Sequence, residues 1–392
     1  MDMSTVLQDE TRGANELPPR TEATTRRVVV TYPMGHAALH NGHMAATRNE
    51  LARHLATLTG FAYAGDYDAL RHGDTPTYFV PSDTMTTEMA SRAGVSRESD
   101  LFGGVVPHPF VATKTITHPL VDTRSRAPVG WCSEFPRRVV DVVLQGWSAF
   151  ANEDALAAGR KILEHGKVRV KPGAGIAGLG QSVADNVTDL ARALDAIAPD
   201  VMAESGVVIE QDLDNVTTYS IGQVHVADLV ATYYGTQSMT TNNHGVEVYG
   251  GSEITVVRGD FDALTALRLP EAVELAIVQA RTYDAAADEC FTGFYASRRN
   301  YDVVQGLDGA RRHRSGVLEQ SWRLGGASGA EIGALEAFRA DPSLKIVHAT
   351  TCEVYGEAPA LPPGAVVYFS GVDASVGALT KYALTEPHAH TR

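Results

Sequence analysis

From residue 27 onward, hydrophobic residues form strand-like runs separated by stretches with helical spacing. Apolar runs at 28–32 and 77–80 predict two β-strands. Between them, residues 44–58 carry apolar side chains at helical spacing, and Gly60 ends the predicted helix. A second helix is predicted from about 82 to 92. Because strands alternate with helices, this part of the chain predicts a small parallel α/β domain.

The later part of the chain has a different pattern, in which long strand-like runs follow one another through turns. Residues 217–226 and 229–236 predict paired antiparallel strands. Two further runs flank the turn signal Asp308-Gly309 and predict a β-hairpin. Pro270 begins a long predicted helix, and residues 365–370 predict an additional strand. The predicted fold class is therefore α/β, with α+β character in the C-terminal part.

These patterns divide the chain into five predicted segments. Residues 1–25 are polar and have no apolar core to bury, which predicts a disordered arm. The remaining segments are a small parallel α/β domain at 26–115, a central α+β subdomain with a glycine flap at 116–215, a C-terminal antiparallel-sheet subdomain at 216–358 and a C-terminal extension at 359–392.

The end of the predicted hairpin carries chemically distinctive side chains. Glu319, Ser321 and Arg323 alternate along one strand, so all three can face the same side. Asp302 lies on the partner strand, where the hairpin would set it beside Glu319. Two carboxylates and a hydroxyl suit Mg²⁺, and an arginine suits phosphate. In the alternative interpretation, these acidic residues only pair with the arginines of an ordinary hairpin.

A lysine followed by glycines forms the second chemical motif. The strand-like run that ends at Lys171 precedes Gly175, Gly178 and Gly180. Glycines let backbone N–H groups approach phosphate closely, and the lysine supplies a positive charge. The same letters fit a dinucleotide-binding fingerprint, which should follow the first strand of a βαβ unit and open a helix directly. Because this run lies in the middle of the chain after a proline, a glycine flap over a nucleotide is favoured.

Together these motifs resemble the ATP-grasp superfamily, and the resemblance covers the chain from about Phe110 to Val354. In the order of that family, Lys114 matches the first nucleotide-binding lysine and Lys171 the second. The resemblance implies a hinge that holds adenine, formed by Glu210, Gln211, Asp212 and Leu213. It also implies a metal and phosphate set, formed by Asp302, Glu319, Ser321 and Arg323.

More narrowly, residues 101–110 and the Glu319 segment resemble a bacterial family catalogued only as a domain of unknown function, which implies no substrate. Two departures from the ATP-grasp pattern matter. Ser321 stands where these enzymes usually carry asparagine, and Thr217-Thr218 replaces a common acidic residue after the hinge. These departures leave open a changed number of metal ions or a degenerate site.

The resemblance implies an ADP-forming ligase that uses ATP and Mg²⁺. ATP would phosphorylate a small-molecule carboxylate, and an amine or a thiol would then attack the acyl phosphate. Lys114 and Lys171 would hold phosphates, and Arg323 and Lys171 are the expected catalytic residues. The alternatives are a small-molecule phosphotransferase and a degenerate, non-catalytic ATP-binding protein. A homodimer is one option for the assembly.

The loop after the first strand is a weaker candidate for substrate contact. It contains Gly35 and His36, and ligands of parallel sheets lie beyond the carboxyl ends of the strands. The histidines at 36, 40 and 43 could instead bind a transition metal. Because the turn signal Asn41-Gly42 would break a helix that carried all three, simple polar contacts are favoured.

Other candidates for substrate contact flank the hairpin. They are Arg298, Arg299, Gly325 and Gly326. Ser328 and Glu331 then predict a capping box at the start of a helix, whose N–H groups could receive an anion.

Composition excludes several function classes. The 33 basic and 47 acidic residues give a net charge of −14 without a basic stripe, which argues against nucleic-acid or anionic-membrane partners. The three cysteines form no CxxC pair, which favours a reducing compartment over a disulfide framework. No segment approaches the ~20 apolar residues needed to span a bilayer. The expected location is the cytoplasm.

Overall fold

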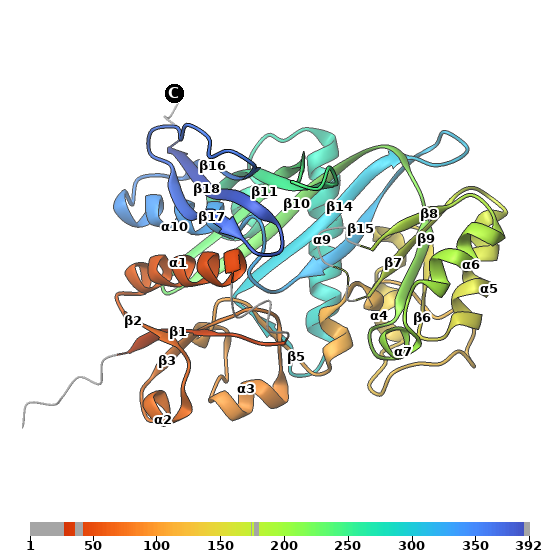
Figure 1. Cartoon of the computed structure of the whole chain (residues 1–392), viewed down its shortest axis with the longest axis horizontal. Coiled ribbons are helices and arrows are strands. Elements are labelled where there is room, and N and C mark those ends of the chain that lie inside the picture. The colour runs from red at the N-terminus through yellow and green to blue at the C-terminus, as the bar shows by residue number, and fades with distance from the viewer. Residues whose placement is uncertain (1–26, 36–41, 174, 176–179, 388–392) are drawn as a thin grey trace, which may run out of the picture.

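The computed structural model describes residues 27–35, 42–173, 175 and 180–387. Its N-terminal part is a parallel sheet in the order β2-β1-β3, next to the helix α1 (Gly42–Thr59) (Figure 1). The strands are β1 (Val28–Tyr32), β2 (Ala62–Asp66) and β3 (Thr77–Pro81). This arrangement confirms the parallel α/β prediction.

The short elements that follow differ from the sequence prediction. The helix α3 (Thr87–Ala93) begins five residues later than expected, and the Thr86 side chain accepts a hydrogen bond from the backbone N–H of Met89 at its start. Before it, β4 (Met85–Thr86) pairs in parallel with β5 (Gly104–Val106), which pairs with β13 (Tyr295–Ala296). This pairing holds residues 85 and 86 extended. A short helix, α2 (Ala69–His72), precedes β3.

The central part is an antiparallel sheet covered by helices on one side. The strand order is β6 (Gly146–Ala149), β9 (Val207–Gln211), β7 (Val168–Pro172) and β8 (Ser182–Ala184). The helices of this part are α5 (Asn152–Leu163), α6 (Val187–Asp195) and α7 (Pro199–Ser205), while α4 (Glu134–Arg138) packs against α9 (Glu271–Cys290). Because β7 is antiparallel to both neighbours, the glycine run does not belong to a βαβ unit, and the dinucleotide-binding alternative is wrong.

A large antiparallel sheet forms the C-terminal part, in the order β15-β14-β10-β11-β12-β16-β18-β17. In chain order its strands are β10 (Asp214–Val226), β11 (Leu229–Thr241), β12 (Glu247–Arg258), β14 (Arg298–Leu307), β15 (His313–Ser321), β16 (Ile346–Tyr355), β17 (Val366–Asp373) and β18 (Gly377–Pro387). The predicted hairpin is thus confirmed as β14–β15, and the strand predicted at 365–370 is β17.

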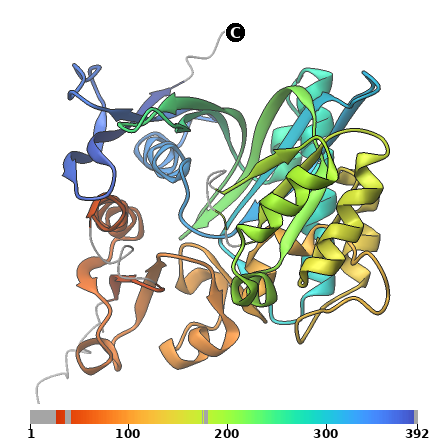
Figure 2. The same cartoon turned by 45° about the vertical axis from the view of Figure 1, so that its right-hand side comes forward.

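Two helices cover opposite faces of this sheet. Alternate residues of each strand point to opposite sides, so each helix packs on a different set of side chains. The helix α9 (Glu271–Cys290) buries Ile277 and Tyr283 against Tyr301 and Val303, while α8 (Phe261–Thr265) packs at its start. On the other face, α10 (Ser328–Ala340) packs on β16, β18 and β12. Figures 1 and 2 show α1 and α10 side by side, which joins the N-terminal part to the sheet in one core.

The last strands also complete the first helix. Asp373, at the end of β17, accepts a hydrogen bond of 2.8 Å from the backbone N–H of His43 in the first turn of α1. A carboxylate is favourable there because it satisfies a helix N–H and faces the positive end of the helix dipole. A Cβ on Gly42 would lie 2.3 Å from this carboxylate, so the close approach requires glycine.

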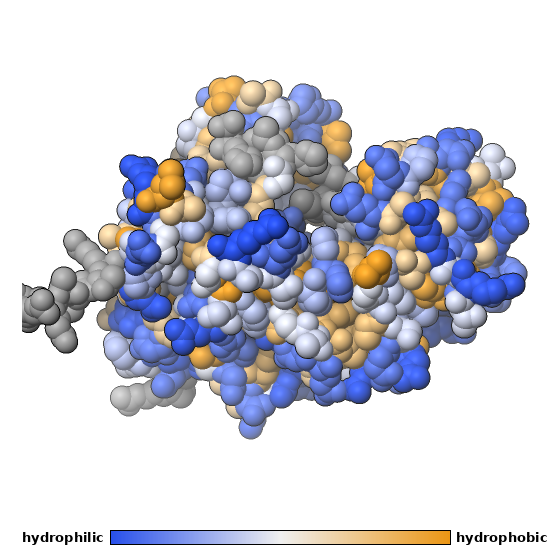
Figure 3. Space-filling view, turned by 90° about the horizontal axis from the view of Figure 1, so that it is seen from below, coloured by the Kyte–Doolittle hydropathy of each residue, from blue (hydrophilic) through white to orange (hydrophobic). Residues whose placement is uncertain are grey.

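A hollow in the surface separates the lobe that carries α5 and α6 from the rest of the molecule (Figure 3). Among the described residues, no helix is both long enough and apolar enough to cross a membrane.

Candidate active site

The register of β14 and β15 gathers oxygen-bearing side chains on one face of the large sheet. Asp302 lies directly opposite Glu319, and Asn300 lies opposite Ser321. On the next strand, Ser220 of β10 lies opposite Asp302. Because residues directly opposite each other share a face, these five side chains form one polar surface.

Asp302 is held by neutral donors on one of its two oxygens. Its Oδ1 accepts hydrogen bonds from the amides of Gln237 (2.9 Å) and Asn300 (3.1 Å) and from the hydroxyl of Ser220 (3.1 Å). Burial, and then the charge of Glu319, raise the pKa of Asp302, while the three hydrogen bonds lower it. Among the described residues, no hydrogen bond or ion pair uses Oδ2, which leaves that oxygen available to a cation.

Lys114 meets the second carboxylate. Its Nζ lies 2.6 Å from Oε2 of Glu319 and donates a 2.8 Å hydrogen bond to the carbonyl oxygen of Gly175 in the glycine segment. The lysine is 3% exposed and Glu319 is 28% exposed, so the carboxylate side of this pair opens to solvent. The contact joins the first predicted lysine, the predicted metal ligand and the glycine segment.

Gln320, on the opposite face of β15, fixes the short turn that carries Lys114. Its Nε2 donates to the carbonyl oxygens of Val111 (3.0 Å) and Thr113 (2.9 Å). Its Oε1 accepts a 3.0 Å hydrogen bond from Tyr283 of α9. Successive side chains of one strand point to opposite faces, so β15 presents Glu319 to the site and anchors Lys114 from behind.

Lys171 belongs to a separate buried cluster. Its Nζ pairs with Oε1 of Glu210, and His118 Nε2 lies 3.0 Å from Oε2 of the same carboxylate. Burial would raise the pKa of Glu210, but Lys171 and His118 lower it to about 2. Glu210 lies opposite Gly146 in the register, and a Cβ there would lie 2.9 Å from the His118 ring. Glycine at this position therefore makes room for the histidine.

Some backbone groups of the hinge after β9 already form hydrogen bonds within the protein. The N–H of Gln211 donates to the carbonyl of Gln145 (2.9 Å), and the N–H of Asp212 donates to the carbonyl of Lys167 (3.0 Å). The Asp212 carboxylate pairs with Arg169 at 2.6 Å. Leu213 is buried. Two of the backbone N–H groups predicted to hold adenine are thus already bonded.

The glycine segment is described only in part. Gly175 donates its N–H to the carbonyl of Pro172 (3.1 Å), and Gly180 has a φ of +76°, in the region that favours glycine. Gly178 lies outside the described residues.

The turn after β15 carries Arg323. Its Nη1 donates to the carbonyl of Leu324 (2.8 Å), and its Nε lies 3.6 Å from the Asp83 carboxylate in the loop after β3. Gly325 and Gly326 follow in the same turn, where a Cβ on Gly326 would lie 2.4 Å from the Tyr249 ring. This turn brings the end of β15 to the carboxyl ends of the N-terminal strands.

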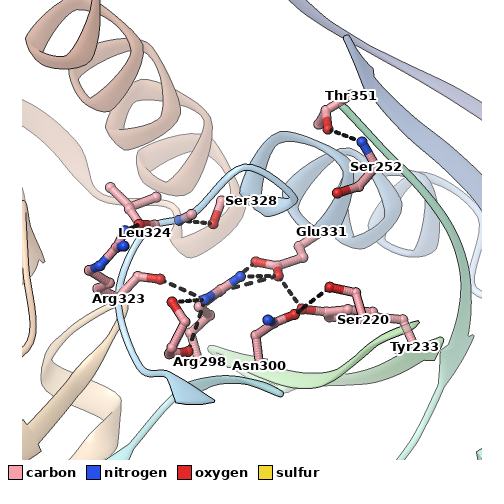
Figure 4. Close-up of polar contacts among 12 residues, drawn as sticks. Ser220, Tyr233, Ser252, Arg298, Asn300, Arg323, Leu324, Ser328, Glu331 and Thr351 are labelled. Atoms are coloured by element: carbon pink, nitrogen blue, oxygen red, sulfur yellow. Dashed lines mark hydrogen bonds and ion pairs between the residues drawn. The ribbon is translucent and has the colours of Figure 1, made fainter. Parts of the chain in front are cut away.

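The predicted capping box at α10 is wrong. Ala327 is the N-cap residue, and its side chain makes no capping hydrogen bond. The Ser328 hydroxyl accepts a 3.0 Å hydrogen bond from the N–H of Gly325 instead. Glu331 pairs with Arg298 at 2.7 Å, and both side chains are buried (Figure 4). Glu331 cannot both cap α10 and pair with Arg298, and it pairs with the buried arginine.

Some predicted residues do not join the others. Arg299 lies on the α9 side of β14, where it pairs with Asp284 (2.8 Å) and Asp288 (2.9 Å). Gly35 follows β1 with a φ of +74°, while His36 and His40 lie outside the described residues. The described part of the chain holds no cluster of three or more His, Cys, Asp or Glu side chains suited to a metal ion.

Sequence reasoning missed Asn300, His118 and Gln320. Asn300 had a visible signal, because it precedes Asp302 by two residues and must share its face. His118 and Gln320 had none, since their roles depend on packing between distant segments.

The donor set on the polar surface fits magnesium better than a transition metal. Asp302 and Glu319 supply carboxylate oxygens, and among the described residues of β14 and β15 no histidine or cysteine lies beside them in the register. Magnesium commonly takes one or two protein carboxylates and completes its shell with water and substrate phosphates.

Comparison with solved structures identifies the fold. The chain is similar to the biotin carboxylase domain dimer of 2-oxoglutarate carboxylase from Hydrogenobacter thermophilus, a complex with MgADP, ADP and bicarbonate, at 12% identity and a TM-score of 0.50, covering 92% of this chain and 86% of that one. It is also similar to phosphoribosylamine–glycine ligase from Thermotoga maritima, at 14% identity and a TM-score of 0.47, covering 93% of each chain. The fold is that of the ATP-grasp enzymes.

Comparison with curated proteins gives no match. The sequence profile described as "Protein of unknown function (DUF3182)" matches residues 29–383. The chain therefore belongs to the DUF3182 family.

Proposed function

We propose that this protein is an ADP-forming ligase that activates a small-molecule carboxylate with ATP and transfers it to an amine or, less often, to a thiol. The observation that carries the proposal is the meeting of Asp302, Glu319 and Lys114 beside the glycine segment. Two carboxylates and an ammonium group fit the needs of a phosphoryl transfer, which depends on positioning and charge neutralisation.

Each residue has a proposed task. Asp302 and Glu319 bind magnesium, which neutralises charge on the nucleotide phosphates. Lys114 and Lys171 bind α- and β-phosphate oxygens with their ammonium groups, and the backbone N–H of Gly180 adds a donor. Lys114 contacts only Oε2 of Glu319, so Oε1 of the same carboxylate can take the cation while the lysine stays in place.

The adenine base is proposed to lie against the hinge. Because the N–H groups of Gln211 and Asp212 are bonded within the sheet, the base uses the remaining backbone groups between Glu210 and Leu213. The buried pair of Lys171 and Glu210 forms one wall of this site.

Substrate is proposed to bind where the turn after β15 meets the loops after β1 and β3. Arg323 stabilises the charge of the transferring phosphoryl group and of the acyl phosphate. Its present partners are a backbone carbonyl and the half-exposed Asp83, so an anionic substrate can compete for its guanidinium. Gly35, Gly325 and Gly326 lie in these loops.

The test is a screen for ADP release from ATP against mixtures of carboxylic acids and amines. We expect ADP and phosphate, and never AMP and pyrophosphate. Hydroxylamine should trap an acyl hydroxamate when the carboxylate is present without the amine. ADP release without a trapped hydroxamate would favour a phosphotransferase, and AMP would contradict the proposal. Glu319→Gln is the control for background hydrolysis.

A further inference from the structure

Arg298 is a buried arginine that is hydrogen-bonded to the end of β15 and the turn after it. Its side chain is 1% exposed. The two N–H groups of its Nη1 are shared among the carbonyl oxygens of Ser321 (3.0 Å) and Arg323 (2.7 Å) and the hydroxyl oxygen of Ser321 (3.2 Å). One guanidinium nitrogen therefore fixes both the backbone and the side chain of the segment that follows Glu319.

The other edge of the guanidinium is fixed from α10. Nε and Nη2 donate to the Glu331 carboxylate at 3.0 and 2.7 Å, and Glu331 is completely buried. The Tyr233 hydroxyl lies 2.5 Å from Glu331 and 2.8 Å from Oδ1 of Asn300 (Figure 4). These contacts leave Arg298 one orientation, because a planar guanidinium bonded along two edges cannot turn.

This orientation decides what the Ser321 hydroxyl can do. A hydroxyl has one proton to donate and two lone pairs. The Arg298 N–H takes one lone pair, and its positive charge disfavours a second cation at the same oxygen. Among the described residues, no hydrogen bond uses the Ser321 proton. The proton is therefore free to be donated to an anion.

Ser321 is well placed for such a donation. It follows Glu319 by two residues on the same strand face, and it lies opposite Asn300. We propose that the Ser321 hydroxyl donates a hydrogen bond to an anionic phosphate oxygen of the bound nucleotide and is not a ligand of magnesium. The structure then assigns Arg298 as the residue that positions this hydroxyl, and the metal binds at Asp302 and Glu319 alone.

This inference rests on the proposed nucleotide site and makes it more specific. It removes Ser321 from the predicted metal set and predicts one divalent ion per chain. It also moves Arg298 from the predicted substrate contacts to the support of the phosphate site.

The experiment counts metal ions directly. Manganese replaces magnesium, β,γ-methylene-ATP serves as a nucleotide that cannot transfer its phosphoryl group, and free manganese is measured by electron paramagnetic resonance. We expect one bound ion per chain. Ser321→Ala should keep that ion with a dissociation constant within about twofold, and should weaken nucleotide binding about tenfold at saturating manganese, as loss of a charge-assisted hydrogen bond does. Ser321→Thr keeps the hydroxyl and should restore the affinity.

A double-mutant cycle tests the role of Arg298. Arg298→Lys keeps a charge for Glu331 but loses the fork that reaches Ser321. Its loss of nucleotide affinity should not add to that of Ser321→Ala, because Arg298 acts through the hydroxyl that Ser321→Ala removes. Additive losses would overturn the positioning role. Should Arg298→Lys fail to fold, the comparison of Ser321→Ala with Ser321→Thr still decides the role of the hydroxyl.

Three results would overturn the inference while leaving the proposed ligase intact. They are two manganese ions in the unaltered protein, loss of the ion in Ser321→Ala, and unchanged nucleotide affinity in that variant. Failure of the unaltered protein to bind the nucleotide at all would instead overturn the proposed function and the inference with it.

Discussion

The two buried lysines of the proposed nucleotide site have different surroundings. Lys171 is enclosed with Glu210, and both side chains are at most 3% exposed. Lys114 is equally buried, but its partner Glu319 is 28% exposed and has a second carboxylate, Asp302, across the register. The first cluster is complete within the protein, whereas the second keeps negative charge open to a cation.

The difference follows from where the partners come from. Lys171 and Glu210 lie on neighbouring strands of one small sheet, so the fold alone brings them together. Lys114 and Glu319 belong to segments that are far apart in the sequence and meet at the glycine segment. In the proposed nucleotide site, the Lys171 end would therefore be part of the stable core, and the Lys114 end would be stabilised by the bound ligand.

The largest expected effect is on stability. Glu210→Gln leaves Lys171 buried without a counter-charge and should lower the free energy of unfolding by about 3–5 kcal/mol. Glu319 is 28% exposed, so water can partly replace its charge beside Lys114, and Glu319→Gln should cost less, about 1–2 kcal/mol. Urea unfolding of the two variants measures both values. Equal losses would contradict the distinction between the two ends.

The second prediction concerns pH. The pKa of Glu210 is lowered to about 2, against an ordinary value of about 4.3. A carboxyl group whose pKa is lower in the folded state stabilises the fold above its unfolded pKa, and that stability is lost as the pH falls towards 2. The gap in unfolding free energy between the unaltered protein and Glu210→Gln, about 3 kcal/mol at pH 7, should therefore close between about pH 4.3 and 2. A gap that stays constant down to pH 3 would argue against a charged Glu210.

The third prediction concerns Glu319, the partly solvent-exposed partner of Lys114. Mg-ATP at about one hundred times its dissociation constant should raise the unfolding free energy by about 2.7 kcal/mol. Glu319→Gln should lose most of this gain, measured as a thermal shift. ATP with a chelator is the control for effects of the nucleotide alone. A full shift in the variant would show that Glu319 is only a structural partner of Lys114.

The smallest expected effect is at Arg323. Arg323→Lys keeps the charge and loses the planar fork, so kcat should fall about tenfold while ATP affinity stays within about twofold. The measurement uses the substrate found by the ADP-release screen. Arg92→Lys, on an exposed face of α3, is the matched control. A variant with full activity would remove Arg323 from the proposed chemistry.

Much of the fold was accessible from the sequence, because it depends on local pattern. Apolar periodicity predicts β1, α1, β3, α9 and the β14–β15 hairpin, since each element buries one regular face. It misses β2, whose residues Ala62–Asp66 include few typical strand formers. It also places α3 too early, because the pairing of β4 with β5 is a long-range contact.

The candidate site also divides into features that follow from local sequence pattern and features that depend on long-range contacts. Asp302 and Glu319 can be placed side by side from the hairpin alone, although their roles remain predictions. Glu331 could not be predicted as it is, because its partner Arg298 lies on a distant strand and outweighs a local capping box. The turn that carries Lys114 depends on Gln320, which the sequence presents as an ordinary strand residue.

The contact between Asp373 and the start of α1 has a consequence for biosynthesis. The carboxylate that completes this helix is 330 residues away along the chain, and α1 packs against α10 and β17 as well. A ribosome therefore releases the N-terminal part long before its final partners exist. Contacts of such separation slow folding and prolong the exposure of apolar surface. The N-terminal part is therefore synthesised first but completes its folding last. Chains cut short before β17 should consequently accumulate as aggregates.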